Sequence, residues 1–202
     1  MMIAAKLAGS SVVCDNPAGV SNFDLTRFAG TWYEQQHSKD PQEPSSYQCS
    51  TAQYTDLTDG DDGLKHFKVY NSFQSKVLGL WTPRIGVHAN ARCGTNGECY
   101  VVFFGHEPAT PNLTVIDTDY DNYAINYWCD DSAKFAHIWI NTRTPTVSDE
   151  YFNSLYAKAM GYLPSFDESI LEPRLTQGDM CSYHALNQSP SAVSMLLSAI
   201  NF

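Results

Sequence analysis

Apolar and polar residues alternate in a series of short runs along the chain. Tyr, Phe, Val, Ile, Thr and Trp are enriched in eight of them: 31–38, 47–57, 64–72, 85–92, 99–105, 112–117, 121–129 and 135–141. A period of two indicates β-strands, and Gly-, Asp-, Asn- and Pro-rich turn sequences separate the runs. With no long helix among them, the pattern predicts an all-β, antiparallel up-and-down barrel of eight strands, closed so that no edge strand is left open.

A single helix is expected after the last strand. Ser148 is a candidate N-cap, and Asp149 and Glu150 follow in the first turn, where the helix dipole favours acids. The residues at helical spacing on one face are Tyr151, Phe152, Leu155, Tyr156 and Ala159, and Gly161 is the expected stop. We interpret this element as a C-terminal helix packed outside the barrel rather than as a partner-binding helix.

Length and charge narrow the classes of protein. The 202 residues suit one domain, predicted over 14–181, with a candidate leader remnant at 1–13 and a C-terminal tail at 182–202. The tail carries a short apolar patch at Met195, Leu196, Leu197 and Ile200. No apolar run is long enough to span a membrane. The net charge of −10, without a basic stripe, argues against nucleic acid as a partner.

Six scattered cysteines and no CxxC motif argue against a metal site and favour disulfides in a secreted protein. Gly94, Asn96 and Gly97 lie between Cys93 and Cys99 and suit a tight turn that a local bridge would staple. The number of cysteines alone does not determine how the other four pair. The triplet Asn112-Leu-Thr is a candidate glycosylation site, which is compatible with secretion.

Three motifs lie at the ends of predicted strands. Gly30 and Trp32 form a Gly-x-Trp motif at the start of the first strand, Thr118-Asp119-Tyr120 follows the predicted strand 112–117, and Arg143 follows the last strand. In this order and spacing, the three motifs resemble the signature regions of the lipocalin family. The sequence 117–124 is similar to the branch that contains apolipoprotein D, insecticyanin, bilin-binding protein and crustacyanin. The resemblance extends from about Cys14 to Cys181.

The resemblance implies a closed end and a set of disulfides. Arg143 is expected to cross the barrel floor and stack on Trp32, with the Thr118–Tyr120 turn beside it, so that Asp119 serves turn geometry rather than catalysis. The implied disulfides are Cys14–Cys129 and Cys49–Cys181, and Cys93–Cys99 would be an additional local bridge.

The lining of the barrel is expected at alternate positions. If Trp32 points into the barrel, alternation along the strand makes Glu34 and Gln36 point inward as well. The resemblance implies the inward positions on the other strands. An ionised Glu34 inside the barrel would need a partner for its carboxylate. Otherwise the inward–outward alternation is shifted at this position. The predicted ligand-binding residues are Gln36, Tyr54, Asn71, Val101, Phe103, Asn126, Trp128, His137 and Trp139, with Ala52, Val69, Leu113, Val115 and Ala124 as further inward positions.

This lining suits a largely apolar molecule with polar groups at defined points. His137 is expected to contact either the ligand or an ordered water. The predicted function is therefore a secreted carrier of a non-covalent hydrophobic ligand: a carotenoid or bilin pigment, a steroid, a retinoid or a fatty acid. No other cofactor and no metal is expected. The predicted mouth loops are 39–47 and 73–84.

Catalytic motifs are missing from the sequence. It has no nucleophile elbow, GxGxxG or HExxH, its histidines lack ligand spacing, and every cysteine has a candidate partner, which argues against a thiol nucleophile and a cysteine-linked bilin. We therefore expect no enzymatic activity. Two alternatives stay open: a lipid-transforming enzyme within the barrel, and a structural protein that acts as a homo- or hetero-oligomer.

Overall fold

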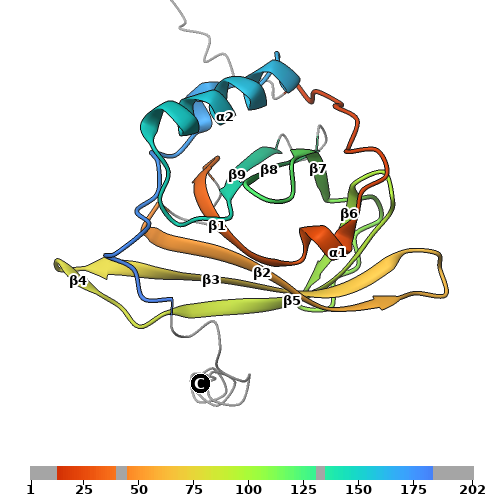
Figure 1. The fold of residues 1–202 in the computed structure, drawn as a ribbon, viewed down its shortest axis with the longest axis horizontal. Coiled ribbons are helices and arrows are strands. Elements are labelled where there is room, and N and C mark those ends of the chain that lie inside the picture. Colours follow the sequence, from red (N-terminus) through yellow and green to blue (C-terminus); the bar gives the residue numbers. More distant parts are fainter. Residues whose placement is uncertain (1–12, 40–44, 131–134, 184–202) are drawn as a thin grey trace, which may run out of the picture.

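The computed structural model describes residues 13–39, 45–130 and 135–183 (Figure 1). Nearly all of the candidate leader, most of the tail including its apolar patch, and part of the 39–47 loop lie outside the described residues. The elements in chain order are α1 (Leu25–Phe28), β1 (Gly30–His37), β2 (Tyr47–Asp59), β3 (Lys65–Val77), β4 (Leu80–Trp81), β5 (Ile85–Cys93), β6 (Glu98–Phe103), β7 (Leu113–Thr118), β8 (Tyr123–Asp130), β9 (Phe135–Thr142), α2 (Asp149–Tyr162) and the 3-10 helix η1 (Glu168–Ile170).

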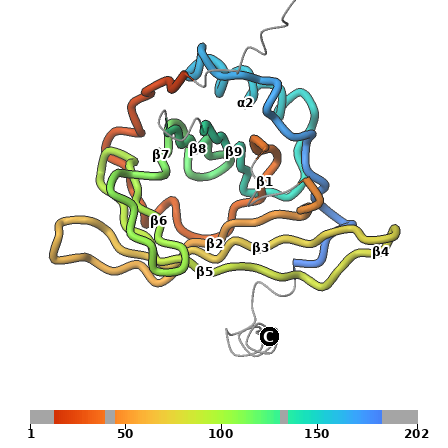
Figure 2. Tube along the Cα trace, turned by 180° about the vertical axis from the view of Figure 1, so that it is seen from behind, coloured from red at the N-terminus to blue at the C-terminus, as the bar shows by residue number. Residues whose placement is uncertain are grey.

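The strands form one closed antiparallel barrel. Their order is β2-β1-β9-β8-β7-β6-β5-β3-β4, and pairing of β2 with β3 closes the ring. Each of the eight predicted runs falls on one of the eight longer strands, so the predicted up-and-down barrel is confirmed. The additional strand β4 has two residues and extends the β3 hairpin beyond the barrel wall (Figures 1 and 2).

Two apolar layers hold the barrel together. Alternate residues point inward, such as Ala124, or outward, such as Ile125, and both of these are fully buried. The outward layer of β7, β8 and β9 packs against Phe152, Leu155 and Ala159 of α2. The helix therefore packs outside the barrel, as predicted (Figure 1).

Helix α2 begins where the sequence predicted but ends slightly later. The Ser148 hydroxyl caps it by accepting a hydrogen bond from the Tyr151 N–H at 3.2 Å. The helix passes Gly161 and ends at Tyr162, because Leu163 is buried at the helix end and anchors the last turn by packing. The expected stop at Gly161 is thus wrong by one residue.

The closed end is built around Arg143. Its guanidinium carbon lies 3.6 Å from the centroid of the Trp32 ring, and its nitrogens donate to the carbonyls of Tyr120, Thr31, Arg27 and Phe28. Gly30 has φ of +97°, a conformation in which other residues would be strained. The helix α1, which the sequence did not predict, supplies two of these carbonyls.

The acidic stretch after β7 is a turn at this closed end. The Asp119 carboxylate accepts hydrogen bonds from the backbone N–H groups of Asp121, Asn122 and Tyr123 and from the Asn122 side chain. Thr118 Oγ1 accepts from the Tyr120 N–H at 2.9 Å and donates to the Tyr123 carbonyl at 2.6 Å. These bonds assign the carboxylate of Asp119 to turn geometry.

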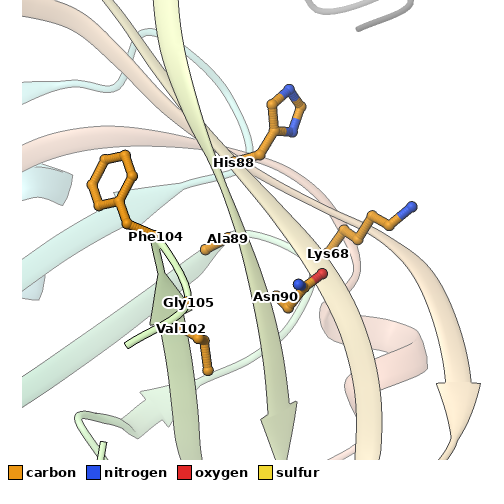
Figure 3. Close-up of a pocket in the computed structure, with 7 residues that line it drawn as sticks. All are labelled: Lys68, His88, Ala89, Asn90, Val102, Phe104 and Gly105. Atoms are coloured by element: carbon orange, nitrogen blue, oxygen red, sulfur yellow. The ribbon is translucent and has the colours of Figure 1, made fainter. Parts of the chain in front are cut away.

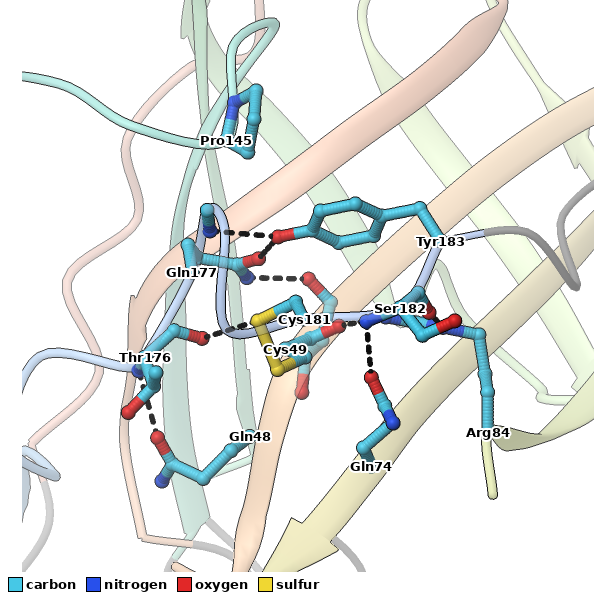
Figure 4. The surroundings of a disulfide bond; sticks show 12 residues. Gln48, Cys49, Gln74, Arg84, Pro145, Thr176, Gln177, Cys181, Ser182 and Tyr183 are labelled. Atoms are coloured by element: carbon cyan, nitrogen blue, oxygen red, sulfur yellow. Dashed lines mark hydrogen bonds between the residues drawn. A yellow bond between two sulfur atoms is a disulfide. The ribbon is translucent and has the colours of Figure 1, made fainter. Parts of the chain in front are cut away.

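Three disulfides connect the six cysteines: Cys14–Cys129, Cys49–Cys181 and Cys93–Cys99. The first two are the pairs that the family resemblance implies, and the third is the additional local bridge predicted from the turn residues between its cysteines. The first joins the N-terminal segment to the end of β8, and the second joins β2 to the C-terminal segment (Figure 4). The third staples the β5–β6 hairpin between directly paired residues.

The C-terminal segment 171–177 completes the wall between β1 and β2. On one side the N–H groups of Glu172 and Leu175 donate to the carbonyls of His37 and Gln35. On the other side the Cys49 N–H donates to the Thr176 carbonyl at 2.9 Å. The pairing of β1 with β2 extends from Gly30 to Tyr33, so this segment supplies backbone partners to the second half of β1.

Candidate ligand-binding site

A β-bulge in β1 decides which of its side chains face the interior. Glu34 pairs with Asn141 and His37 with Trp139, whereas Gln36 pairs with Ile140, which packs in the outer layer. The bulge thus turns Gln36 outward, and its amide nitrogen donates to the Glu172 carbonyl at 2.8 Å. The predicted inward position of Gln36 is wrong, and His37 takes its place.

Glu34 has a buried partner. His37 Nδ1 lies 2.6 Å from Glu34 Oε1, and the side chains are only 1% and 11% exposed. The prediction that Glu34 points into the barrel was therefore correct. Its pairing with His37 offsets the cost of burying the carboxylate. The sequence alone did not identify this pair, because the bulge that brings the two residues to the same face has no sequence signature here.

Two ring contacts, one edge-on and one stacked, connect this pair to β9. The rings of His37 and His137 are 5.8 Å apart and nearly perpendicular. His137, which is fully buried, stacks on Trp139 with ring centroids 3.9 Å apart. The structure thus places two histidines, a carboxylate and an indole together inside the barrel.

β8 adds an amide to this group. Asn126 pairs with Trp139, and Trp128 pairs with His137, so all four side chains share the inward face. Asn126 is 3% exposed, and its Oδ1 accepts no hydrogen bond from the residues that the structure describes. We call Glu34, His37, Asn126, His137 and Trp139 the polar wall.

The other strands give the interior its apolar character. Tyr54, Val69, Val101, Leu113, Val115 and Ala124 are buried in the inner cluster, with Ala52 and Phe103 packed against it. Tyr54 packs edge-on against Phe28 at 5.3 Å, close to the closed end. Asn71 pairs with Ala52 on the inward face, and its Oδ1 is a second buried amide oxygen without a hydrogen bond in the described structure.

Asn112 lies outside this group. Its side chain accepts from the Val101 N–H at 2.7 Å and donates to the Val101 carbonyl at 2.9 Å. The carboxamide therefore holds the β6–β7 connection, and glycosylation at Asn112 stays a prediction.

A separate hollow of about 300 Å³ lies on the outer surface of the barrel (Figure 3). Lys68, Asn90 and Val102 share a row across β3, β5 and β6, one position away from the inward row Val69, Ala89 and Phe103. Phe104 and Gly105 border the hollow. This hollow is distinct from the predicted interior site.

The described residues contain no group of three or more His, Cys, Asp or Glu side chains that could hold a metal ion. In the same part of the chain, no helix has the length and apolar character needed to cross a membrane.

Known proteins share this fold and sequence pattern. A family model described as a lipocalin-like domain matches residues 23–170. Insecticyanin-A of Manduca sexta is 35% identical over 139 residues, which cover 65% of this chain and 69% of the relative. Outer membrane lipoprotein Blc of Escherichia coli K12 is 30% identical over 165 residues, covering 79% and 87%.

Solved structures agree with the sequence matches. The structure of insecticyanin from Manduca sexta has a TM-score of 0.64 at 26% identity and covers 85% of this chain and 90% of its own. Lobster apocrustacyanin A1 has a TM-score of 0.60 at 19% identity, covering 88% and 97%, and shows the fold alone. Because the family model spans most of the chain, including both ends of the barrel, the chain belongs to the lipocalin family.

Proposed function

We propose that this lipocalin is secreted and carries a small, largely hydrophobic molecule non-covalently inside its barrel. The observation that carries the proposal is the composition of the inward face, where an apolar and aromatic majority meets one polar wall. Such a lining is typical of sites for apolar ligands that are oriented by a few polar contacts. Three disulfides support an oxidising, extracellular location.

The polar wall suggests how the ligand is oriented. The stacked rings of His137 and Trp139 offer a face to a ring or a conjugated chain. Asn126 Oδ1, which accepts no hydrogen bond from the described residues, suits a hydroxyl or N–H donor of the ligand. A carotenoid or bilin pigment fits this description best, and a steroid, retinoid or fatty acid is the alternative within the same function.

Ligand identity is tested on protein purified from its natural source. We expect organic extraction followed by mass spectrometry to release one hydrophobic compound. For a pigment, a visible absorption band would also disappear on denaturation. Protein that contains no extractable compound and binds none of the five ligand classes would contradict the proposal.

Asn126→Leu tests the site itself. Asn126 Oδ1 is buried and accepts no hydrogen bond from the described residues, so replacing this amide by an apolar side chain of similar size should raise the free energy of unfolding of the ligand-free protein by about 1 kcal/mol. The same change should weaken ligand binding by roughly tenfold, because one hydrogen bond to the ligand is lost. Asn90→Leu, on the exposed outer face, is the matched control and should leave ligand affinity unchanged.

A second candidate function is a lipid-transforming enzyme in the same barrel. It is favoured by one observation, the contact between Glu34 and His37 Nδ1, because a carboxylate that orients a histidine is a common arrangement for general-base catalysis. Incubating candidate lipids with the protein distinguishes the two functions. A carrier returns its ligand unchanged, whereas an enzyme gives a product whose formation Glu34→Gln slows.

A further inference from the structure

The β3–β4 hairpin presents an apolar tip to solvent. We call residues 76–81 the mouth hairpin, since it projects beyond the barrel at the end away from α1 (Figure 1). Lys76 pairs with Trp81 and Val77 with Leu80, around a turn at Leu78 and Gly79. Leu78 is 98% exposed, Leu80 75% and Val77 56%.

The turn itself does not favour leucine. Leu78 and Gly79 have φ of +50° and +83°, the signs of a type I′ turn, whose first central position favours Asn, Asp or Gly. Asn22 and Asp56, also at positive φ, are residues that suit this conformation. A strained and fully exposed Leu78 contributes nothing to packing within the described fold, so we attribute it to contact with something outside the chain.

The base of the hairpin is held rigidly. Thr82 exchanges hydrogen bonds with Ser75, and the Gln74 side chain donates to the Thr82 carbonyl at 2.9 Å. Arg84 donates to the carbonyls of Cys49 and Ser182, both at 2.7 Å, beside the Cys49–Cys181 disulfide (Figure 4). The apolar tip is therefore a preformed projection, which lowers the entropic cost of using it for binding.

The shape and charge of the mouth hairpin indicate what kind of surface it contacts. A stable protein interface buries roughly 1,200–2,000 Å² in total, which a two-residue turn with three apolar side chains cannot supply alone. No acidic residue occurs between Asp62 and Glu98, although the whole chain has a net charge of −10. Lys76, whose Nζ lies 5.6 Å from the Trp81 ring centroid, adds the pairing of a cation and an indole that suits a membrane interface.

We propose that the mouth hairpin is a lipid-docking element, which inserts Leu78 and Leu80 between the acyl chains of a phospholipid surface. Apolar contact drives the docking, with Trp81 and Lys76 at the level of the headgroups. Docking in this way directs the open end of the barrel, where Tyr47 stacks on Phe73 at 3.4 Å, toward the lipid. The proposal stands without the carrier function, because vesicle binding is measured with no ligand present.

The test is co-sedimentation of the full chain with phosphatidylcholine vesicles at low and at high salt. We expect the wild-type protein to bind at both, since apolar insertion does not depend on ion pairing. Leu78→Asn should weaken binding by about tenfold or more, because a leucine side chain no longer enters the lipid. Its melting temperature should be unchanged or raised, because asparagine suits the turn.

Phe104→Asn is the matched control. Phe104 is 82% exposed and also has positive φ before a glycine, but it borders the outer hollow rather than the hairpin tip (Figure 3). This variant should bind vesicles as the wild-type protein does. The proposal is overturned if the wild-type protein does not bind, if high salt releases it, or if Leu78→Asn binds equally well.

Two further results would assign the tip to another occupant and overturn the proposal as well. In one, analytical ultracentrifugation shows a wild-type dimer that Leu78→Asn disperses, which identifies a second copy of the chain. In the other, only a variant that lacks residues 184–202 binds vesicles, which identifies this segment as the cover of the tip.

Discussion

At the scale of single residues, the closed end depends on how one carboxylate is held. Burial by itself raises the pKa of Asp119, but hydrogen bonds from the Asn122 side chain and from the backbone of Asn122, Tyr123 and Asp121 outweigh it and lower the pKa. A lowered folded-state pKa stabilises the protein fully above the unfolded value of about 3.9 and loses this contribution as pH falls through the folded value.

Asp119→Asn should therefore lower the free energy of unfolding by about 1–2 kcal/mol at neutral pH. The difference from wild type should shrink as pH falls from about 4 toward the lowered folded-state pKa, because the wild-type carboxylate becomes protonated first in the unfolded and then in the folded protein. Urea unfolding at neutral and acidic pH measures both quantities. Asp121→Asn is the control, because the Asp121 carboxylate forms an exposed ion pair with Arg27 at the surface, and a similar pH-dependent loss there would refute the assignment.

Arg143 and Arg27 allow a matched test of the barrel floor. Arg143→Lys loses the stack on Trp32 and most of the hydrogen bonds to carbonyls, so we expect a loss of more than about 2 kcal/mol in unfolding free energy. Arg27→Lys changes an exposed stack on Tyr120 and should cost less than about 1 kcal/mol. Equal losses in chemical denaturation would argue against the special role of Arg143.

Residue positions were predictable from sequence where a local motif or a simple alternation determines them. Trp32 faces Arg143 because both belong to recognisable motifs, and Asn126 and Trp139 follow the alternation of uninterrupted strands. Gln36 was misplaced because a bulge in β1 resets the alternation. That bulge depends on pairing with β9 and on the distant C-terminal segment, neither of which is visible in the residues around Gln36.

At the scale of elements, the long strands and α2 were predicted well, and the short elements were missed. Helix α1, strand β4 and the 3-10 helix η1 have two to four residues each, too few for a periodic pattern. The extended segment 171–177 was missed for another reason. Its hydrogen bonds go to β1 and β2, far earlier in the chain, and its sequence has no alternation.

Two disulfides should stabilise these elements to different extents. Cys49–Cys181 closes a loop of 132 residues and Cys93–Cys99 one of 6. In the chain-entropy description, removing the first pair by double substitution to serine should cost about 5 kcal/mol and removing the second about 2 kcal/mol. Guanidinium unfolding of the two double variants shows which one loses more unfolding free energy. A larger loss for the Cys93–Cys99 pair would show that the entropy of the unfolded chain does not dominate.

At the scale of the whole molecule, the barrel combines a rigid closed end with a chemically uneven interior. The closed end is fixed by backbone hydrogen bonds to Arg143 and by the Asp119 turn, whereas the polar wall lies along β8, β9 and the second half of β1. The fold could be predicted from strand patterns and three motifs. The ligand could not, because its recognition depends on side chains that meet only after the bulge and the closure of the barrel.

Ligand removal should lower the stability of the entire barrel if the interior is the binding site. A ligand present at about 100 times its Kd adds about 2.7 kcal/mol to the unfolding free energy, which corresponds to a rise in Tm of roughly 5–10 °C for a chain of this size. Scanning calorimetry of protein before and after organic extraction measures this shift. The shift should be smaller in Asn126→Leu, which weakens binding, and unchanged in Leu78→Asn, whose side chain lies outside the barrel. An equal decrease in both variants would place the ligand against the mouth hairpin as well as the polar wall, because only a ligand that contacts both could lose stabilisation from both changes.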